Sequence, residues 1–334
     1  MSSIFITGVA GFLGSFVADR MIDLGHDVVG CDNLIGGYLD NVNPRVDFHQ
    51  VDCNDFREIE KIMNGCDIVY NCAATAYEGF SVFSPVLVTK NIVTSSVSIF
   101  TAAIANKVKR IIHCSSMARY GTNIVPFVES MNTNPQDPYG IGKVAAEKLL
   151  SNLCEVHGVE YVIAVPHNII GPRQKYDDPY RNVASIMINL MLQGRQPIIY
   201  GTGEQKRCFS FIQDDIDILE QLAFKEGISG ETFNIGPDEE FVSINELAAI
   251  IANLIGFDLN PSYVTGRPQE VFLANCSADK IRKVFDYKTK YTLRDGLLEM
   301  IDYIKNRGSK PFLYHLDLEI NSDITPVTWK NKLF

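Results

Sequence analysis

Two hydroxyls and a tyrosine–lysine pair are the groups in this sequence whose types and spacing best suit chemistry. Ser115 and Ser116 directly follow the largely apolar run Ile111–Cys114, and Tyr139 and Lys143 come later, four residues apart. Residues four apart share one face of a helix, so the Lys143 ammonium would favour the ionised phenol and lower the pKa of Tyr139. Such a phenolate can take a proton from an alcohol while hydride leaves the same carbon, with Ser116 holding that hydroxyl in line. We therefore predict that Ser116, Tyr139 and Lys143 are catalytic.

A site for the hydride acceptor is predicted by the glycines near the N-terminus. The apolar run at residues 4–6 leads into Gly8, Gly11 and Gly14, and a helical pattern follows. A strand, a glycine-rich turn and a helix in this order form a phosphate cradle, because the start of the helix directs free N–H groups and partial positive charge at an anion. The spacing is G-x-x-G-x-x-G, not the commoner G-x-G-x-x-G. A glycine turn can also serve packing alone.

Asp32 indicates which dinucleotide this turn would hold. It ends a second apolar run, Val28–Cys31, about 20 residues beyond the glycines, where an acidic residue binds both ribose hydroxyls of an adenosine. A carboxylate there repels a 2′-phosphate, so we expect NAD rather than NADP; the alternative is a simple turn residue before Asn33. A cationic nicotinamide ring would then help Lys143 to favour the phenolate. The predicted cofactor contacts in this region are Gly8, Gly11, Phe12, Leu13, Gly14, Asp32 and Asn33.

The elements that must position these residues alternate along the chain. Strand-like runs are expected at 4–7, 27–32, 46–51, 66–72, 108–114 and 161–166, and helical patterns at 14–24, 56–64, 91–106 and 139–155. Such alternation predicts an α/β fold of the Rossmann type, a doubly wound parallel sheet with helices on both faces. Ligands of these sheets lie beyond the carboxyl ends of the strands. The residues at those ends are Asp32, Asp52, Ala73, Ser115 and Pro166.

The alternation weakens after residue 167, where glycine, proline and polar clusters multiply. We expect residues 1–166 to form the NAD-binding domain, with segments returning to it from 205–237. Residues 167–334 would form mainly a smaller α/β lobe that binds substrate, together with a C-terminal tail. A chain of this length can bury a core in each part.

The composition is that of a globular protein with a reduced interior. The chain has 334 residues, 46% of them apolar, and a formal net charge of −10, which disfavours nucleic acid and anionic membranes as partners. Its eight cysteines are scattered without a C-x-x-C pair, so we expect free thiols, no bound metal and a cytoplasmic location. We expect no secretion signal, because the first strand starts so early in the sequence. We also expect no membrane span, because no apolar run approaches the roughly 20 residues that one needs.

Six motifs, in order, resemble those of one family over most of the chain. They lie at Gly8–Gly14, Ser115–Gly121, Pro135–Lys143, Asn168–Gln174, Tyr200–Arg207 and Arg267–Glu270. They resemble the motifs G-x-x-G-F-x-G, S-S-x-x-x-Y-G, P-x-x-P-Y-x-x-x-K, N-V-Y-G-P-R-Q, Y-G-D-G-x-Q-x-R and R-P-G-D. These motifs are found in the extended short-chain dehydrogenase/reductases, in their nucleotide-sugar epimerase and dehydratase branch. The resemblance implies a Rossmann domain that holds NAD and a nucleotide-diphospho-sugar substrate.

The resemblance also implies further cofactor contacts. Asp52 and Cys53 would border the adenine. Ala73 would border the central phosphates and ribose, and Asn91 would brace the backbone beside the site. Lys143 would also reach the nicotinamide ribose. The remaining implied contacts, at strand ends and on the catalytic helix, are Ser115, Tyr139, Lys143 and Pro166.

Substrate contacts are implied in the second lobe. Asn168 would touch the diphosphate of the substrate. Arg207 and Arg267 would bind that diphosphate or its ribose, because a planar guanidinium suits phosphate oxygens; the alternative for each is a solvated surface charge. Ala274 stands seven residues after Arg267, at the position that gates the sugar pocket in 4-epimerases. A small residue there would leave room for a 2-acetamido group.

The chain departs from the family pattern at several positions. Met117 and Ala118 replace the Asp-Glu pair with which dehydratases remove water, so 4,6-dehydration is not expected. Val165 replaces the arginine that usually precedes the Asn168 motif, and Cys208 replaces an aspartate. These changes leave the exact substrate contacts open.

The resemblance implies an NAD-dependent nucleotide-sugar epimerase that acts through a transient 4-keto intermediate, most simply at C4 of a UDP-hexose or UDP-N-acetylhexosamine. Two alternatives stay open. A nucleotide-sugar 4-dehydrogenase or reductase would use the same three residues and release a keto sugar. A non-catalytic NAD-binding sensor would commonly lose Tyr139 or Lys143. The helices at 91–106 and 139–155 correspond to the pair that forms a four-helix interface in relatives, so a homodimer is expected.

Overall fold

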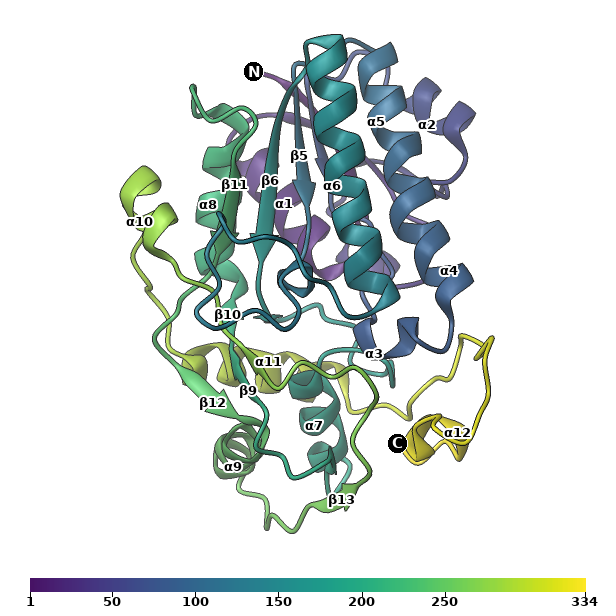
Figure 1. The fold of residues 1–334 in the computed structure, drawn as a ribbon, viewed down its shortest axis with the longest axis vertical. Helices are drawn as coiled ribbons and strands as arrows, with labels where there is room; N and C mark the ends of the chain where they lie inside the picture. Colours follow the sequence, from purple (N-terminus) through teal and green to yellow (C-terminus); the bar gives the residue numbers. More distant parts are fainter.

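A seven-stranded parallel sheet organises the computed structural model, which describes all residues from 1 to 334 (Figure 1). The strands are β1 (Ser3–Thr7), β2 (Asp27–Cys31), β3 (Asp47–His49), β4 (Ile68–Asn71), β5 (Arg110–Cys114), β6 (Glu160–Pro166) and β11 (Thr232–Ile235). Their order is β11-β6-β5-β4-β1-β2-β3, and every neighbouring pair is parallel. The order reverses between β1 and β4, and ligands of such sheets bind at this switch point.

Helices cover both faces of the sheet, which confirms the predicted Rossmann-type fold. One face carries α1 (Phe12–Asp23) and α8 (Ile212–Phe224), which pack against each other. The other face carries α2 (Phe56–Ile62), α5 (Ser95–Ala105) and α6 (Pro138–His157). The strands read as nearly continuous apolar runs because both of their faces are buried under helices.

The sheet differs from the expectation at its two edges. β3 is shorter than the predicted run 46–51, because only Asp47–His49 pairs with β2. At the opposite edge, β11 pairs with β6, and α8 leads the chain toward it. Neither element was assigned from the sequence, but both lie within the stretch 205–237 from which segments were expected to return.

The helix predicted at 91–106 is longer and begins at Pro85, a residue that suits the first helical position. It runs through α4 (Pro85–Thr89), a π-helical turn at Lys90–Thr94 and α5. By length and composition, this 21-residue helix would be able to cross a membrane, which corrects the expectation that no such stretch exists. Half of its most apolar window is buried inside the protein, as in a core helix, so this is weak support for a membrane span.

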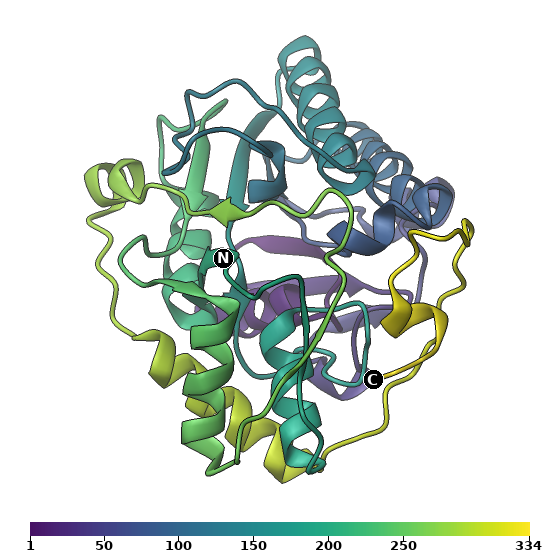
Figure 2. The same cartoon turned by 60° about the horizontal axis from the view of Figure 1, so that its bottom comes forward.

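A smaller α/β lobe lies below the sheet in Figure 1 and comes forward in Figure 2. Its helices α7 (Val183–Leu192), α9 (Ile244–Ile255) and α11 (Leu293–Arg307) share an apolar core of their own. Its strands are β7 (Ile169–Ile170), β8 (Ile198–Tyr200), β9 (Lys206–Cys208), β10 (Ser210–Phe211), β12 (Phe241–Ser243), β13 (Ser262–Val264) and β14 (Leu273–Ala274). They form the sheet β12-β9-β14 and the pairs β10-β7 and β13-β8. The remaining elements are α3 (Glu78–Ser81), α10 (Asp279–Phe285), α12 (Val327–Lys330) and 3₁₀ turns at Leu39–Asn41 and Met117–Arg119.

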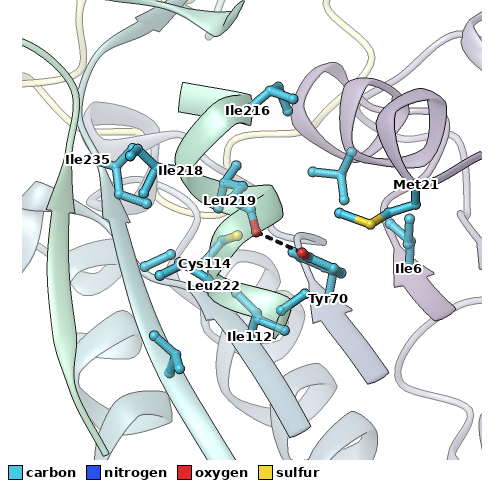
Figure 3. Packing of buried hydrophobic residues seen from close by; sticks show 14 of the residues in the cluster. Ile6, Met21, Tyr70, Ile112, Cys114, Ile216, Ile218, Leu219, Leu222 and Ile235 are labelled. Atoms are coloured by element: carbon cyan, nitrogen blue, oxygen red, sulfur yellow. Dashed lines mark hydrogen bonds between the residues drawn. The ribbon is translucent and has the colours of Figure 1, made fainter. Parts of the chain in front are cut away.

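Tyr70 joins the sheet to α8 inside the apolar core (Figure 3). The side chain is fully buried on β4, and its hydroxyl donates a 2.7 Å hydrogen bond to the carbonyl oxygen of Leu219. Apolar side chains such as Ile112, Ile216 and Leu222 surround this bond. The bond fixes α8 against the sheet at the point where the chain has returned from the second lobe.

Tyr70→Phe should lower the free energy of unfolding by about 1–2 kcal/mol, because it removes one buried hydrogen bond and little volume. Urea unfolding measures this change. Tyr263→Phe is the matched control, since that tyrosine is 53% exposed and its hydroxyl bonds only to Asn245. Equal losses in the two variants would contradict the role given to Tyr70.

Candidate active site

A cavity of about 410 Å³ opens at the carboxyl ends of the main strands and is lined by both lobes. It brings together nearly all of the predicted site residues. Those that line it are Gly8, Gly11, Phe12, Leu13, Gly14, Asp32, Asn33, Asp52, Cys53, Ala73, Asn91, Ser115, Ser116, Tyr139, Lys143, Pro166, Asn168, Arg207 and Arg267. All eight cysteines of the chain are free. No group of three or more His, Cys, Asp or Glu side chains is arranged to hold a metal ion.

The glycine turn at one end of the cavity is folded too tightly for side chains. Gly8 has a φ of +72°, and its N–H donates to the Cys31 carbonyl oxygen at 2.8 Å. A Cβ atom on Gly14 would lie 2.2 Å from the Gly8 carbonyl oxygen, closer than any real contact. Helix α1 starts at Phe12, two residues before the predicted start, and Gly11 is its N-cap without a capping side chain. The first N–H groups of α1 are therefore free to bind an anion.

Asp32 both stabilises this turn through hydrogen bonds and lines the cavity. Its carboxylate accepts N–H bonds from Ala10 at 3.1 Å and from Leu34 at 2.7 Å. Burial raises the pKa of Asp32, although these N–H groups act in the opposite direction. Asp32 therefore acts as a turn residue, which was the alternative to ribose binding in the sequence analysis. It also lies where the ribose hydroxyls are expected. Each carboxylate oxygen has a second lone pair for such hydroxyls.

A chain of polar side chains fixes the edge where the adenine is expected. Asp52 accepts from the Asn33 amide at 3.1 Å and from the backbone N–H of Asn54 at 2.8 Å. The Asn54 side chain donates to Asn91 at 3.1 Å, and Asn91 donates to Thr75 at 3.0 Å. Asn91 lies in the π-helical turn, a feature that often marks functional sites. The turn, the Asp32 carboxylate and these braced loops together fit a dinucleotide.

The first two turns of α6 carry the tyrosine and lysine into the cavity. Asp137 caps this helix by accepting from the Gly140 N–H at 2.7 Å. The Lys143 ammonium donates to the Cys114 carbonyl oxygen at 2.7 Å and lies 5.9 Å from the centre of the Tyr139 ring. Both side chains are almost fully buried. The predicted shared face of the helix is therefore present.

The hydroxyls after β5 are held by two different contacts. Ser116 caps the following 3₁₀ turn, and its oxygen accepts from the Ala118 N–H at 3.2 Å. Ser115 donates to Glu147 on the inner side of α6, and Glu147 pairs with Arg119 at 2.9 Å. All of these side chains are buried. The end of β5 and the catalytic helix are thereby linked through side chains as well as through packing.

The ionisation of Tyr139 differs from the expectation that Lys143 lowers its pKa. Burial raises the pKa of Tyr139 above its ordinary value; the Ser116 hydroxyl opposes this, and the carboxyls of Glu78 and Asp137 raise it further. Burial also lowers the pKa of Lys143. The protein alone therefore keeps the phenol protonated. Oxidised NAD, when bound, supplies both a hydride acceptor and a positive charge that favours the phenolate.

Two arginines of the second lobe reach the cavity from β9 and from the turn before β14. Arg207 donates to the carbonyl oxygen of Val271 at 2.6 Å, and Arg267 pairs with Glu270 at 2.8 Å. Their side chains are only 13% and 29% exposed, so neither is a solvated surface charge. The Nε atom of Arg267 is buried without a partner. Because native proteins pair nearly all buried donors, this N–H is available for an oxygen of a ligand.

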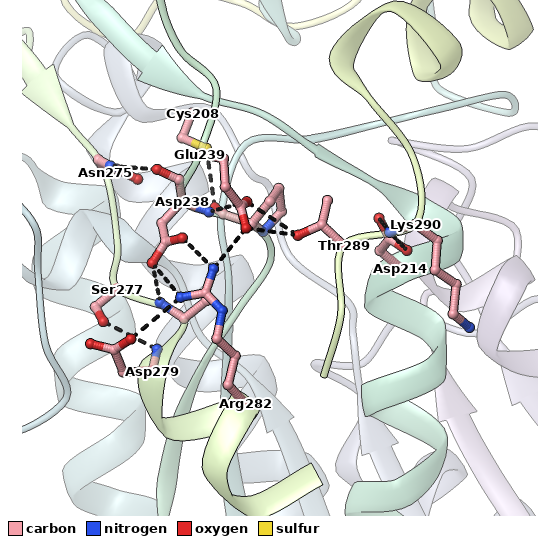
Figure 4. A network of polar contacts seen from close by, with 12 residues as sticks. Cys208, Asp214, Asp238, Glu239, Asn275, Ser277, Asp279, Arg282, Thr289 and Lys290 are labelled. Carbon is pink, nitrogen blue, oxygen red and sulfur yellow. Dashed lines mark hydrogen bonds and ion pairs between the residues drawn. The ribbon is translucent and has the colours of Figure 1, made fainter. Parts of the chain in front are cut away.

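A polar network behind β9 holds this wall in place (Figure 4). Arg282 on α10 donates to Asp238 at 3.0 Å and to Glu239 at 2.8 Å, close to Cys208 on β9. The Asn168 side chain, at a backbone φ of +44°, donates to the carbonyl oxygen of Cys208 at 2.9 Å. Asn168 therefore lines the cavity while it anchors the strand that carries Arg207.

Ala274 is the predicted site residue that does not line the cavity. It pairs with Arg207 across β14 and β9, and its side chain is 5% exposed. It packs in an apolar cluster with Met117, Tyr120 and Cys276. The position expected to gate the sugar is turned into the core here. The room for a 2-acetamido group therefore has to be judged from other residues.

Several lining residues were missed by the analysis of the sequence, among them Glu78, Arg181 and Trp329. Arg181 donates to the carbonyl oxygen of Gly36 at 2.6 Å and lies 5.0 Å over the Tyr77 ring, so it connects the second lobe to the loop after β2. No local pattern marks these residues. Only the fold brings them to one place.

Comparison with known proteins places this site in a family. The sequence pattern of the NAD dependent epimerase/dehydratase family matches residues 4–236. The chain belongs to this family. It is 32% identical over 310 residues to a putative UDP-glucose 4-epimerase of Methanocaldococcus jannaschii. This alignment covers 91% of this chain and 99% of that protein. It is 30% identical over 316 residues to UDP-glucuronic acid decarboxylase 6 of Arabidopsis thaliana. This alignment covers 92% of this chain and 90% of that protein.

Solved structures of UDP-sugar epimerases share the fold over about nine-tenths of this chain. The UDP-glucose 4-epimerase of Thermotoga maritima with UDP-glucose has a TM-score of 0.85 at 29% identity, over 91% of this chain and 99% of that one. The UDP-glucuronic acid 4-epimerase of Bacillus cereus, in complex with UDP-glucuronic acid and NAD, has a TM-score of 0.85 at 27% identity. The match covers 92% of this chain and 100% of that one. NAD is thus the cofactor of this epimerase-family protein. Its relatives differ in sugar and in reaction, so membership alone does not choose between them.

The buried cap Asp137 should make stability depend on pH. Burial, followed by the Glu78 carboxyl, raises the pKa of Asp137 from 3.8 to about 7. Between these values the unfolded chain releases a proton that the folded chain keeps, so stability falls as the pH rises through this window. Asp137→Asn still caps the helix but cannot ionise. In urea unfolding, the variant should gain stability over the parent at about pH 8 and not at about pH 4.

Asp55→Asn is the matched control for this prediction. Asp55 caps α2 by accepting from the Glu58 N–H at 3.3 Å, and it is exposed. Because this carboxyl is not buried, its replacement should not stabilise the protein at about pH 8. If the difference between Asp137→Asn and the parent is independent of pH, the Asp137 carboxyl is not held protonated.

Proposed function

We propose that this protein is an NAD-dependent UDP-sugar 4-epimerase, which interconverts the two C4 configurations of a UDP-hexose or UDP-N-acetylhexosamine through a transient 4-keto sugar. The observation that carries the proposal is one cavity lined by Ser116, Tyr139 and Lys143 together with the dinucleotide turn. Relatives named UDP-glucose 4-epimerase, which this chain matches over about nine-tenths of its length, support it.

Tyr139 is the proton-transfer group in this proposal. Its phenolate takes the proton of the C4 hydroxyl as hydride leaves C4, and it returns the proton when hydride comes back on the opposite face. Ser116 hydrogen-bonds the same substrate oxygen. Lys143, fixed to the Cys114 carbonyl oxygen, adds positive charge beside the phenolate. The keto sugar has to turn over between the two transfers.

The residues after Ser116 argue against an elimination reaction. Met117 and Ala118 stand where dehydratases carry an acid–base pair, and both are buried in apolar clusters. Neither side chain can transfer a proton. A 4,6-dehydration would therefore lack the groups that remove water.

A carboxyl group near the catalytic tyrosine favours a neutral sugar over a uronic acid. Glu78 lines the cavity, and burial raises the pKa of its carboxyl, although the charges of Arg207 and Arg267 act in the opposite direction. It lies close enough to Tyr139 to raise the pKa of that phenol. A uronate would bring a second carboxylate into this region, at an electrostatic cost. This argument supports a neutral-sugar substrate over the uronic acid used by the relatives named UDP-glucuronic acid decarboxylase.

A panel of UDP-, GDP- and dTDP-sugars tests the proposed reaction, with NMR detecting the epimer and absorbance detecting NADH. UDP-glucose or UDP-N-acetylglucosamine should give epimer without net NADH. Tyr139→Phe should reduce turnover by about 100- to 10,000-fold, because it removes the acid–base group. Tyr263→Phe, at an exposed tyrosine, should leave turnover unchanged.

Three other results of this panel would contradict a 4-epimerase. Stoichiometric keto sugar with NADH would indicate a dehydrogenase or reductase. Loss of carbon dioxide from UDP-glucuronic acid would indicate a decarboxylase. Tight NAD binding without turnover of any sugar would indicate a sensor protein.

A homodimer formed through α5 and α6 belongs to the same proposal, as does a cytoplasmic location. Ile141, Leu149 and Val156 are 54%, 36% and 70% exposed on α6. Val144 and Leu150, on the same helix, are buried within the chain instead. Sedimentation at micromolar concentration should show a dimer, and Leu149→Glu should shift it toward monomer by burying a charge at the interface. A monomer for the unchanged protein would contradict the dimer.

A further inference from the structure

The C-terminal segment after α11 is built into the wall of the cavity. It crosses from the second lobe to the main domain and lies near α3 and α4, where it is drawn in yellow (Figures 1 and 2). The Leu313 N–H donates to the Asp177 carbonyl oxygen at 2.8 Å, and the Ile320 N–H donates to the Phe83 carbonyl oxygen at 2.8 Å. The Glu319 carboxylate accepts two N–H groups at the start of α4, both at 2.8 Å. The segment is therefore anchored in both lobes.

The short helix α12 places Trp329 in an aromatic pocket. The indole is 4% exposed and packs edge-on against the rings of Phe80, Phe83 and Tyr180. The distances between ring centres are 6.1, 6.0 and 5.6 Å, respectively. Aromatic contacts in this range are favourable beyond the area they bury. The indole is thus held in one orientation by rings from both lobes.

Trp329 lies next to residues of the reacting end of the cavity. A Cβ atom on Gly79 would lie 3.4 Å from Cη2 of the indole and 3.2 Å from Nη1 of Arg267, so the two side chains meet over the same backbone position. Ser81, on the same short helix as Gly79, accepts the backbone N–H of Tyr139 at 3.2 Å. Tyr139 and Trp329 belong to one buried cluster, and both line the cavity.

The indole N–H of Trp329 is buried without an acceptor. Its polar neighbours are satisfied, because Tyr180 donates to the Leu316 carbonyl oxygen at 3.1 Å, and the hydroxyls of Thr328 and Tyr200 bond to each other. Native proteins leave few buried donors unpaired. The indole N–H is therefore a donor for an oxygen that the chain itself does not provide.

We propose that Trp329 is a sugar-recognition residue, which borders the hexosyl group of the nucleotide-sugar with the part of its ring that lines the cavity and donates its N–H to an oxygen of that sugar. This rests on the proposed function, because Tyr139 has to reach a sugar carbon. A hexose presents an apolar C–H face and hydroxyl or acetamido oxygens, which match the two properties of an indole. The C-terminal segment then takes part in substrate specificity as well as in joining the lobes.

Trp329 is the only tryptophan in the chain, so its fluorescence reports this contact in the unmodified protein. The NAD-loaded, full-length protein is titrated with UDP-glucose, UDP-N-acetylglucosamine and UDP. Either UDP-sugar should shift or quench the emission more than UDP at saturation does. An identical response to UDP and to the UDP-sugars, or no response to any of them, would overturn the proposal.

Calorimetric binding by variants gives a second, independent measurement. Trp329→Phe keeps a ring but removes the N–H, so it should weaken binding of the UDP-sugars by about 3- to 10-fold while binding of UDP changes by less than about twofold. The control is Lys330→Ala, at an exposed residue of the same helix, which should change neither. Equal weakening of UDP and UDP-sugars in Trp329→Phe would overturn the role of Trp329 and leave the proposed function standing. An unmodified protein that binds neither UDP-sugar more tightly than UDP would overturn both.

Discussion

Burial of ionisable side chains on the inner face of α6 is the constraint on which the catalytic arrangement depends. Lys143 and Glu147 both lie against the end of β5, and neither is exposed to bulk water. Lys143 is compensated by the Cys114 carbonyl oxygen at 2.7 Å, and Glu147 by Arg119 at 2.9 Å. Breaking one partner of a buried ionic contact is strongly destabilising, by about 3–5 kcal/mol. The helix therefore cannot shift along β5 without losing these contacts, and Tyr139, one turn earlier, is held in place.

Much of this arrangement could be predicted from the sequence because its determinants are local. Gly8, Gly11 and Gly14 lie within one turn, and the reason they are needed is the close approach of α1 to the Gly8 carbonyl oxygen. Tyr139 and Lys143 share a helical face by their spacing alone. The alternation of strand and helix then decides the fold class, and parallel strands bring their carboxyl ends to one edge. The short strand β11 and the helix α8 were not predicted from the sequence, because they belong to the sheet domain only through contacts with distant segments.

What the sequence could not predict depends on distant packing and on burial. The direction of Ala274 is set by the pairing of β14 with β9, a contact between segments far apart in the chain. Glu78, Arg181 and Trp329 reach the cavity from three separate regions, and no local pattern connects them. The pKa of Tyr139 also follows from burial, which outweighs the Ser116 hydroxyl and the Arg181 guanidinium. Spacing predicted that this residue shares a helical face with Lys143, but its protonation state required the surrounding structure.

The raised pKa of Tyr139 has a consequence for the proposed reaction. Burial and the carboxyls of Glu78 and Asp137 disfavour the phenolate, so the phenol ionises only while additional positive charge lies beside it. That charge is present on oxidised nicotinamide and absent once hydride has left the sugar. Tyr139 then keeps the proton that it took, and the proton remains available when the hydride returns. A tyrosine that stayed ionised by itself would instead lose the proton to solvent, leaving the keto sugar without its proton donor. The environment of the phenol thus fits the proposed 4-epimerisation, in which proton and hydride both come back to the sugar.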